Sequence, residues 1–226
     1  MEKPKLTIVF APEGALEIIN RATRTAYRSH DKEKPGTRED FIGNLVKQGH
    51  ESIIEHVSVN FELSNISRAC ATQILRHRLA SYTCESMRYV KLVSDTDHLE
   101  IVTPIAIEGN ADALKIFDKA VLSAEKAYKA LIDMGIKAED ARACLPIATC
   151  TRMFFTYNFR EIRHFLKERL SPRAQREIRL VALQMYEYMY DMYPWLVKDL
   201  HVLYEEGLAK SNKEIPVDPN MGTTGK

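Results

Sequence analysis

Short apolar segments and one segment of alternating apolar and polar positions predict several β-strands. Residues 5–11 (KLTIVFA) are mostly apolar and β-branched and are followed by Pro12, which predicts a short buried strand. Residues 57–63 (VSVNFEL) alternate between apolar and polar side chains, as expected for a strand with one buried face. The segment 99–104 (LEIVTP) is predicted to form another strand. Residues 151–157 (TRMFFTY) are compatible with a strand or with a buried helical turn, and the strand is preferred.

Helical spacing of apolar residues covers most of the remaining chain. Thr37 is predicted to start one helix in a capping box, Asn158 to cap a second and Ser171 a third. The longest amphipathic segment is predicted to stop at Gly135. The predicted helices span residues 15–28, 37–49, 64–78, 111–134, 138–144, 158–169 and 171–192.

The order of these elements predicts an α+β fold. We expect a single domain over residues 1–208, with a mixed or antiparallel β-sheet flanked by α-helices and long helices in the C-terminal half. Residues 209–226 are polar and rich in turn residues, so they are expected to form a flexible tail. No internal repeat or linker divides the chain.

Composition narrows the class of protein. With 45% apolar residues in 226, the chain can bury a core. Lys and Arg number 32 against 31 Asp and Glu, which argues against a dedicated nucleic-acid or membrane-surface binder. The four cysteines form no C-x-x-C pair, which favours reduced thiols. Since no signal-like or membrane-length apolar run is present, we expect a cytoplasmic protein without a membrane partner.

Candidate chemistry is concentrated in residues 76–89 (RHRLASYTCESMRY), which combine four basic side chains with hydroxyls and a thiol. At a helix end, cationic side chains interact favourably with the macrodipole, and this interpretation needs no ligand. A turn with arginines and hydroxyls also suits an anionic ligand rich in oxygen. Consecutive helical side chains point about 100° apart, so Arg76 and Arg78 would diverge. This predicts two ligands, or ligands shared across a subunit boundary.

Two other segments have ordinary explanations. The basic residues of 158–169 are compatible with a solvated helix face. The segment 50–56 (HESIIEH) resembles a metal motif, but its histidines lie six residues apart and would not share a helical face. No metal site is predicted.

Phosphate-binding and nucleophile motifs are missing from the sequence. The nine glycines form neither G-x-G-x-x-G nor a P-loop, so arginines and loops must hold any nucleotide. Cys84 is the cysteine in the most reactive setting, and a methyltransferase with Cys84 as nucleophile is one alternative, although no partner base is evident.

The residues Arg76-His77-Arg78, seven further positions and Ser86 resemble the R-H-R-x7-S signature of flavin-dependent thymidylate synthases. Further similarity to this family covers residues 48–56, 67–78, 141–152 and 158–178. The resemblance implies reductive methylation of dUMP to dTMP without a cysteine nucleophile. Methylenetetrahydrofolate would supply the carbon, and FAD reduced by NADPH would carry the hydride. It also implies a homotetramer with active sites shared between subunits.

The resemblance implies a set of site residues. Arg169 would stabilise negative charge as uracil N3 ionises, and Ser86 would position the substrate rather than attack it. His50 is a candidate on the folate side. The residues expected to bind FAD are Ser52, Arg76, His77, Arg78, Cys84, Asn158, Arg160 and His164. The residues expected to bind dUMP are Gln73, Ile74, Leu75, Arg76, Cys84, Glu85, Ser86, Met87, Arg88, Arg142 and Arg169.

Three positions depart from the family pattern, and one of them is Arg173, which stands where His is common. Cys84 stands where Glu or Gln is usual, and His164 stands where some members have Asn. A non-catalytic nucleotide- or RNA-binding module that uses the arginine clusters is the alternative function, and the balanced net charge counts against it.

Overall fold

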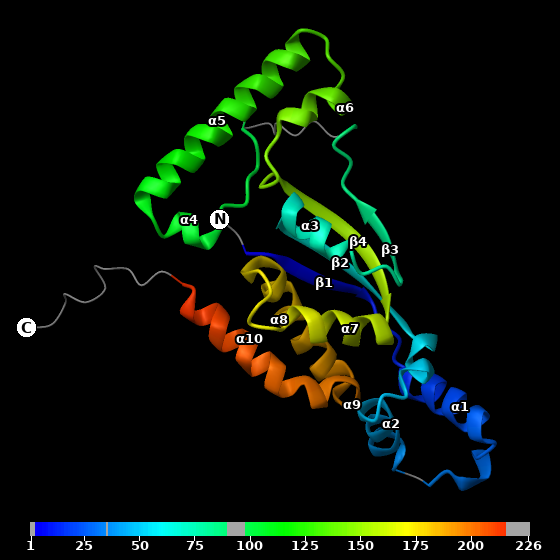
Figure 1. The fold of residues 1–226 in the computed structure, drawn as a ribbon. Helices are drawn as coiled ribbons and strands as arrows, with labels where there is room; N and C mark the ends of the chain where they lie inside the picture. Colours follow the sequence, from blue (N-terminus) through cyan, green and yellow to red (C-terminus); the bar gives the residue numbers. More distant parts are fainter. Residues whose placement is uncertain (1–2, 35, 90–97, 216–226) are drawn as a thin grey trace, which may run out of the picture.

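The computed structural model describes residues 3–34, 36–89 and 98–215, and a four-stranded antiparallel sheet lies at its centre (Figure 1). Its strands are β1 (Lys5–Phe10), β2 (Ser58–Ser67), β3 (Ala80–Cys84) and β4 (Cys150–Asn158). They are arranged in the order β1-β2-β4-β3, and every neighbouring pair is antiparallel. The predicted α+β class is therefore confirmed, and residues 151–157 form a strand.

One face of the sheet carries the core. Phe61 of β2 and Phe155 of β4 are paired in register, and their rings stack with centroids 5.1 Å apart. On the opposite face, Asn60 Nδ2 donates to Thr156 Oγ1 at 2.7 Å. The alternation seen in the sequence thus separates an apolar face from a more polar one.

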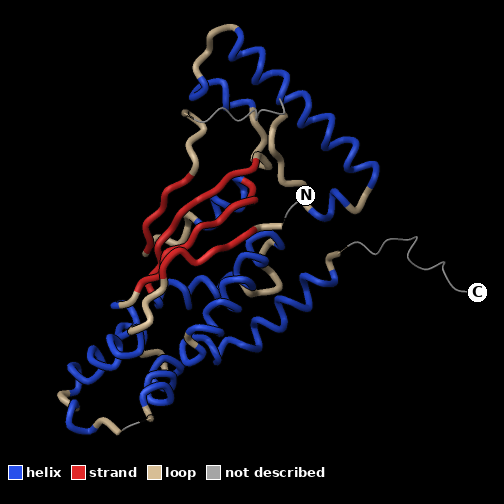
Figure 2. The backbone as a smooth tube through the Cα atoms, turned by 180° about the vertical axis from the view of Figure 1, so that it is seen from behind, coloured by secondary structure: helices blue, strands red, loops and turns tan. Residues whose placement is uncertain are grey.

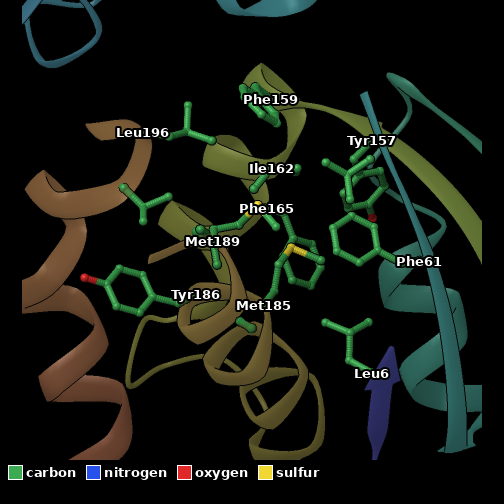
Figure 3. Close-up of a cluster of buried hydrophobic side chains, with 14 of the residues drawn as sticks. Leu6, Phe61, Tyr157, Phe159, Ile162, Phe165, Met185, Tyr186, Met189 and Leu196 are labelled. Carbon is green, nitrogen blue, oxygen red and sulfur yellow. The ribbon is translucent and has the colours of Figure 1, made fainter. Parts of the chain in front are cut away.

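The apolar face is covered by helices from the C-terminal half (Figure 2). These are α7 (Phe159–Arg169), α8 (Arg176–Met192), α9 (Pro194–Val197) and α10 (His201–Lys213). Figure 3 shows side chains of α7 and α8, such as Phe165 and Met185, beside Phe61 and Tyr157 of the sheet. The predicted long C-terminal helices are confirmed.

Three further helices contribute residues to this core, namely α1 (Ala15–Tyr27), α2 (Arg38–Lys47) and α3 (Arg68–Ile74). The helices α4 (Ile105–Glu108), α5 (Ala111–Asp133) and α6 (Ala138–Ala141) lie outside it. The 3-10 turns are η1 (His30–Lys32), η2 (Glu51–His56), η3 (Arg142–Cys144) and η4 (Lys198–Leu200). α5 extends away from the sheet in Figure 1, and Glu125 and Tyr128 are its buried residues. No helix among the described residues is long and apolar enough to cross a membrane.

The capping residues predicted from the sequence agree with some helix starts and not with others. Asn158 does cap α7, because its Oδ1 accepts a hydrogen bond from Glu161 N at 2.9 Å. Thr37 is the N-cap residue of α2, so this helix starts where it was predicted, but its hydroxyl donates to Lys34 O and makes no capping hydrogen bond. Ser171 lies in a turn, and α8 begins later, at Arg176. The predicted helix start at Thr37 is therefore confirmed without its capping box, and the predicted cap at Ser171 was wrong.

Several boundaries differ because tertiary contacts decide them. β2 continues beyond residue 63 to Ser67, after a register shift near Asn65, whose φ is +58°. Such an irregularity interrupts the alternation on which the prediction relied. Segment 99–104 forms an isolated bridge from Ile101 to Thr149 rather than a strand.

The last helix also ends later than the predicted boundary between the domain and the C-terminal tail. α10 continues to Lys213, so that five of its residues, 209–213, belong to the predicted tail. Residues 216–226 of the predicted tail lie outside the described residues. The predicted helix 138–144 is divided into α6 and η3, and α9, α10 and β3 were not predicted.

Candidate active site

The Arg-His-Arg segment lies in a turn after α3, outside the helix that was predicted to contain it. His77 N donates to Ile74 O at 3.0 Å, and the hydroxyl of Tyr82 lies 2.6 Å from His77 O. His77 is only 4% exposed, whereas Arg76 and Arg78 are exposed. The helical angle between the arginines therefore does not apply, but both side chains still reach solvent while the histidine is buried.

The buried imidazole of His77 is held at both ring nitrogens. Its Nδ1 lies 2.9 Å from Glu161 Oε1, and Arg169 Nε donates to its Nε2 at 3.1 Å. Arginine has only donors, so Nε2 must be the acceptor and the proton of a neutral imidazole is on Nδ1. Burial, with further contributions from the charges of Arg169 and His164, lowers the pKa of His77 to about 4. The neutral imidazole is therefore the form that this site favours.

The pair of His77 and Glu161 is shielded from water. Glu161 is 2% exposed, and burial raises the pKa of its carboxyl despite the opposing charge of His164. The rings of Phe165 and Tyr157 pack against the imidazole, with centroid distances of 4.9 and 6.4 Å. In such surroundings a buried polar group depends on its protein partners.

Arg169, the last residue of α7, joins this pair to α3. Its Nη2 lies 3.5 Å from Gln73 O, and the side-chain amide of Gln73 donates to the side chain of Gln175. In the described part of the chain Arg169 forms no ion pair, and no hydrogen bond uses its Nη1. The structure thus brings the predicted residues Gln73, His77 and Arg169 together and leaves the charge of Arg169 uncompensated.

A second cluster forms where the chain leaves β3. Arg88 Nε donates to Glu139 Oε2 at 2.9 Å, and Arg142 Nε donates to Glu139 O at 3.0 Å. Ser86 Oγ accepts from Arg88 N at 3.2 Å. The predicted dUMP residues Ser86, Arg88 and Arg142 therefore lie close together, with Glu139 between the arginines.

Arg68 belongs to this second cluster and was not predicted. Its Nη2 donates to Glu85 O at 2.9 Å, while its buried Nε has no hydrogen-bond partner among the described residues. Glu85 N in turn donates to Arg152 O at 3.0 Å. The sequence signal was limited to the position of Arg68 inside the stretch 67–78 that resembles the family.

A third group lies around the start of α7. Arg160 forms an ion pair with Glu55 of η2, and its Nε lies 3.9 Å from Glu51 Oε2. Ser52 of the same 3-10 turn is exposed, and His50 precedes it as an exposed N-cap residue. Asn158 is close by, but its side-chain oxygen is already used as the cap of α7.

His164 connects this third group to the first. It lies on the exposed face of α7, and its ring centroid is 5.4 Å from that of His77. Three of the remaining predicted residues differ in accessibility. Ile74 is fully buried in the core, Leu75 is 41% exposed and Met87 is half-buried. Any contact of Ile74 with a ligand would have to come from its backbone.

Cys84 ends β3 and is half-buried. Burial raises the pKa of its thiol, and this effect exceeds the opposing influence of Arg68. A thiol is a poorer nucleophile than a thiolate, so this setting disfavours a cysteine nucleophile.

His77, Glu161 and His164 also resemble a metal-binding set, since one ligand atom from each lies within 4.8 Å of the others. The two nitrogens of His77 already engage Glu161 and Arg169, and the positive guanidinium opposes a further cation. The arrangement is satisfied as a hydrogen-bonded chain. The predicted absence of a metal stays a prediction.

Comparisons with known proteins agree with this picture. Residues 7–195 match the model of the thymidylate synthase complementing protein family. The chain is 35% identical over 194 residues to a flavin-dependent thymidylate synthase of Geobacter sulfurreducens, covering 83% of this chain and 82% of the relative. It is also 35% identical over 191 residues to the enzyme of the same name from Pyrococcus furiosus, with 82% and 78% covered.

A solved structure shares the fold. It is the UMP/dUMP methylase PolB of Streptomyces cacaoi, determined with 5-Br dUMP, with a TM-score of 0.75 and 24% identity over 89% of this chain and 96% of that chain. The resemblance carried by the R-H-R signature is confirmed. Both the extent of the match and the identity to the relatives show that this chain belongs to the thymidylate synthase complementing protein family.

Proposed function

We propose that this chain is a flavin-dependent thymidylate synthase that converts dUMP to dTMP. Its relatives carry that name, and the shared fold occurs in a dUMP methylase. The single observation that carries the proposal is the side chain of Arg169, which is oriented by His77 and Gln73 without an acidic partner among the described residues. An uncompensated guanidinium of fixed orientation suits a substrate that develops negative charge.

The proposed role of Arg169 follows from its free donors. With Nε engaged by His77, the Nη1 edge remains available for the uracil base. Negative charge at uracil N3 raises the electron density at C5, which must attack the methylene carbon of the folate. A guanidinium held in place stabilises this charge without reorganisation during the reaction.

The second cluster is proposed to bind the nucleotide phosphate. Arg88 and Arg142 converge on Glu139, and Ser86 lies in the same segment with its hydroxyl oriented by Arg88 N. Paired guanidinium groups suit a phosphate dianion, which would compete with the Glu139 carboxylate for Arg88. Arg68 would support this segment through its hydrogen bond to Glu85 O.

The flavin is proposed to contact the exposed arginines. Arg76 and Arg78 are both exposed, and within the described residues neither has an acidic partner, so these groups fit the diphosphate of FAD. Ser52 of η2 and Arg160 and His164 of α7 are also exposed and would extend this surface. FAD would carry the hydride from NADPH toward the methylene group, and methylenetetrahydrofolate would enter on the side of His50.

The proposed site is shared between subunits of a homotetramer. Leu75 and Leu79, which flank the Arg-His-Arg turn, are 41% and 64% exposed, although they lie beside the proposed ligand groups. α5 is amphipathic, yet Ile116 and Leu122 remain 73% and 49% exposed. Exposed apolar surface of this kind favours coverage by a second copy of the chain.

The test is a reconstitution under anaerobic conditions. When purified protein is mixed with FAD, NADPH is expected to reduce the flavin and bleach its absorbance. After addition of methylenetetrahydrofolate and dUMP, dTMP is expected to form and is measured by chromatography. The matched variant Cys84→Ala is expected to keep its activity, because the thiol is not the nucleophile. Protein that binds dUMP or RNA but neither takes up flavin nor forms dTMP would instead support the non-catalytic binding module.

A further inference from the structure

We infer that Glu161 is a positioning residue for Arg169 and that it acts through the protonation pattern of His77. The inference rests on the proposed function for the role of Arg169, but the hydrogen-bonded chain itself is a property of this protein. Glu161 was not among the residues that the sequence indicated for the site. It lies 84 residues from His77 along the chain, so folding alone brings the pair together.

The direction of each hydrogen bond follows from the donors available. Arg169 Nε carries a hydrogen at every accessible pH, so His77 Nε2 must accept. The proton of the neutral ring is then on Nδ1, where Glu161 Oε1 is the acceptor at 2.9 Å. A doubly protonated ring would place two donors face to face at the 3.1 Å contact with Arg169.

Without Glu161 the tautomer of His77 with its proton on Nε2 would become more populated. A buried Nδ1–H with no acceptor is costly, whereas an Nε2–H would face the half-buried side chain of Arg169, which could move aside toward ligand or solvent. Arg169 would then lose its acceptor and keep only the longer contact to Gln73 O at 3.5 Å. Glu161 therefore selects the tautomer that holds the guanidinium.

Among the groups around His77, Glu161 is the one that can accept a hydrogen bond from Nδ1. The groups that face His77 are Arg169, His164 and Glu161 of α7, Tyr157 of β4, and Tyr82 of β3, whose hydroxyl lies near the backbone oxygen of His77. Among these side chains, only Glu161 lies within hydrogen-bond distance of Nδ1. The backbone of Glu161 is itself fixed by the Asn158 cap at 2.9 Å.

The first experiment compares Glu161→Met with Glu161→Gln. The Met side chain has a similar volume but no acceptor, whereas the Gln carbonyl can still accept from Nδ1. For Glu161→Met we expect kcat to fall by about 10- to 100-fold, the loss typical of a displaced reactive group, and the KM for dUMP to change by less than about threefold. Glu161→Gln is expected to restore most of the activity.

The controls separate positioning from folding. Glu168→Met makes the same exchange at an exposed position of α7 and should leave kcat and thermal stability unchanged. In an Arg169→Ala background, Glu161→Met should cause no further loss, because its effect passes through Arg169. Additive losses, or equal losses for Met and Gln, would contradict the inference.

The second readout does not depend on activity. Side-chain ¹⁵N spectra of the full chain labelled at histidine, with and without FAD, should contain a neutral Nδ1–H signal that disappears in His77→Gln. This signal should persist in Glu161→Gln and shift to the Nε2–H pattern in Glu161→Met. Wild-type His77 in the Nε2–H form would overturn the inference. If the protein makes no dTMP but gives the expected spectra, the proposed function is refuted, whereas the inferred effect of Glu161 on the tautomer of His77 stands.

Discussion

Two arginines of the same helix, Arg163 and Arg169, differ in what compensates their charge. Arg163 is 1% exposed and forms two hydrogen bonds with Asp199, at 2.7 and 2.8 Å, besides a bond to Leu196 O. Arg169 is half-buried and contacts a neutral histidine and a backbone oxygen. The ion pair between Arg163 and Asp199 joins α7 to η4 and neutralises the charge of Arg163. A neutral partner orients Arg169 and leaves its charge available for a ligand.

The contrast extends to the electrostatics. The carboxylates of Asp199 and Glu51 raise the pKa of Arg163 against the effect of burial, and Arg163 lowers the pKa of Asp199. The pairing therefore stabilises both charges at the interface of α7 with η4. The pKa of His77 is instead lowered, so that no second cation forms beside Arg169. The comparison predicts that one arginine mainly serves stability and the other mainly serves turnover.

Replacing Arg163 should have the largest effect on stability. Arg163→Met leaves Asp199 and Leu196 O without their donor, and loss of one partner of a buried ion pair costs about 3–5 kcal/mol. Urea unfolding at fixed protein concentration is the measurement. A loss below about 1 kcal/mol would show that the pair is not a structural anchor, and the comparison would then fail.

Replacing Arg169 should have the largest effect on catalysis. Arg169→Ala removes a donor that stabilises developing charge, so kcat should fall by about 100- to 1,000-fold. Thermal unfolding should change less than in Arg163→Met, because His77 Nε2 loses a donor but no carboxylate among the described residues depends on this side chain. If Arg169→Ala chiefly unfolds the protein while the folded fraction keeps its turnover, the proposed role is wrong.

The neutral state of His77 should appear as a pH dependence of stability. Its pKa is about 4 in the folded protein and 6.5 as an ordinary histidine, so between these values the unfolded chain binds a proton that the folded chain does not. Stability should therefore fall as the pH drops from about 6.5 toward 4, by up to about 3 kcal/mol.

His77→Gln isolates this contribution. The variant retains Glu161, whose raised pKa acts in the opposite sense, and lacks the titrating ring. Urea unfolding at several pH values should give a flatter profile for the variant between pH 6.5 and 4. Parallel profiles for the two proteins would mean that His77 does not stay neutral in the fold.

Replacing an exposed arginine of the turn should have the smallest effect. Arg78→Ala removes one charged contact to the proposed flavin diphosphate, which corresponds to about 1.5–3 kcal/mol, or roughly a 10- to 100-fold weaker affinity for FAD. Fluorescence titration with FAD is the measurement. Lys119→Ala on the exposed face of α5 provides the control, and an unchanged affinity in Arg78→Ala would remove Arg78 from the flavin surface.

The difference between Arg163 and Arg169 could not be predicted from the stretch NFREIRHFLKER. Both residues are basic positions of one amphipathic helix, and periodicity describes only how a helix presents its faces. The resemblance to the family identified Arg169 as functional. It did not indicate Glu161, and it assigned His77 to the flavin without predicting that both ring nitrogens have partners within the protein.

The sequence by itself determined the α+β class, the apolar strand β1, the alternating strand β2, the preference for a strand at β4, the cap of α7 at Asn158 and the family signature. These depend on neighbours a few positions apart, so a local pattern is sufficient to predict them. Tertiary structure alone decided that α3 ends at Ile74, that Arg68 supports Glu85 O, and that His77 lies between Glu161 and Arg169. The partners of His77 lie 84 and 92 residues away, and only packing of α7 against the turn after α3 brings them together. The charge of a side chain is encoded locally, whereas its partner is determined by the fold.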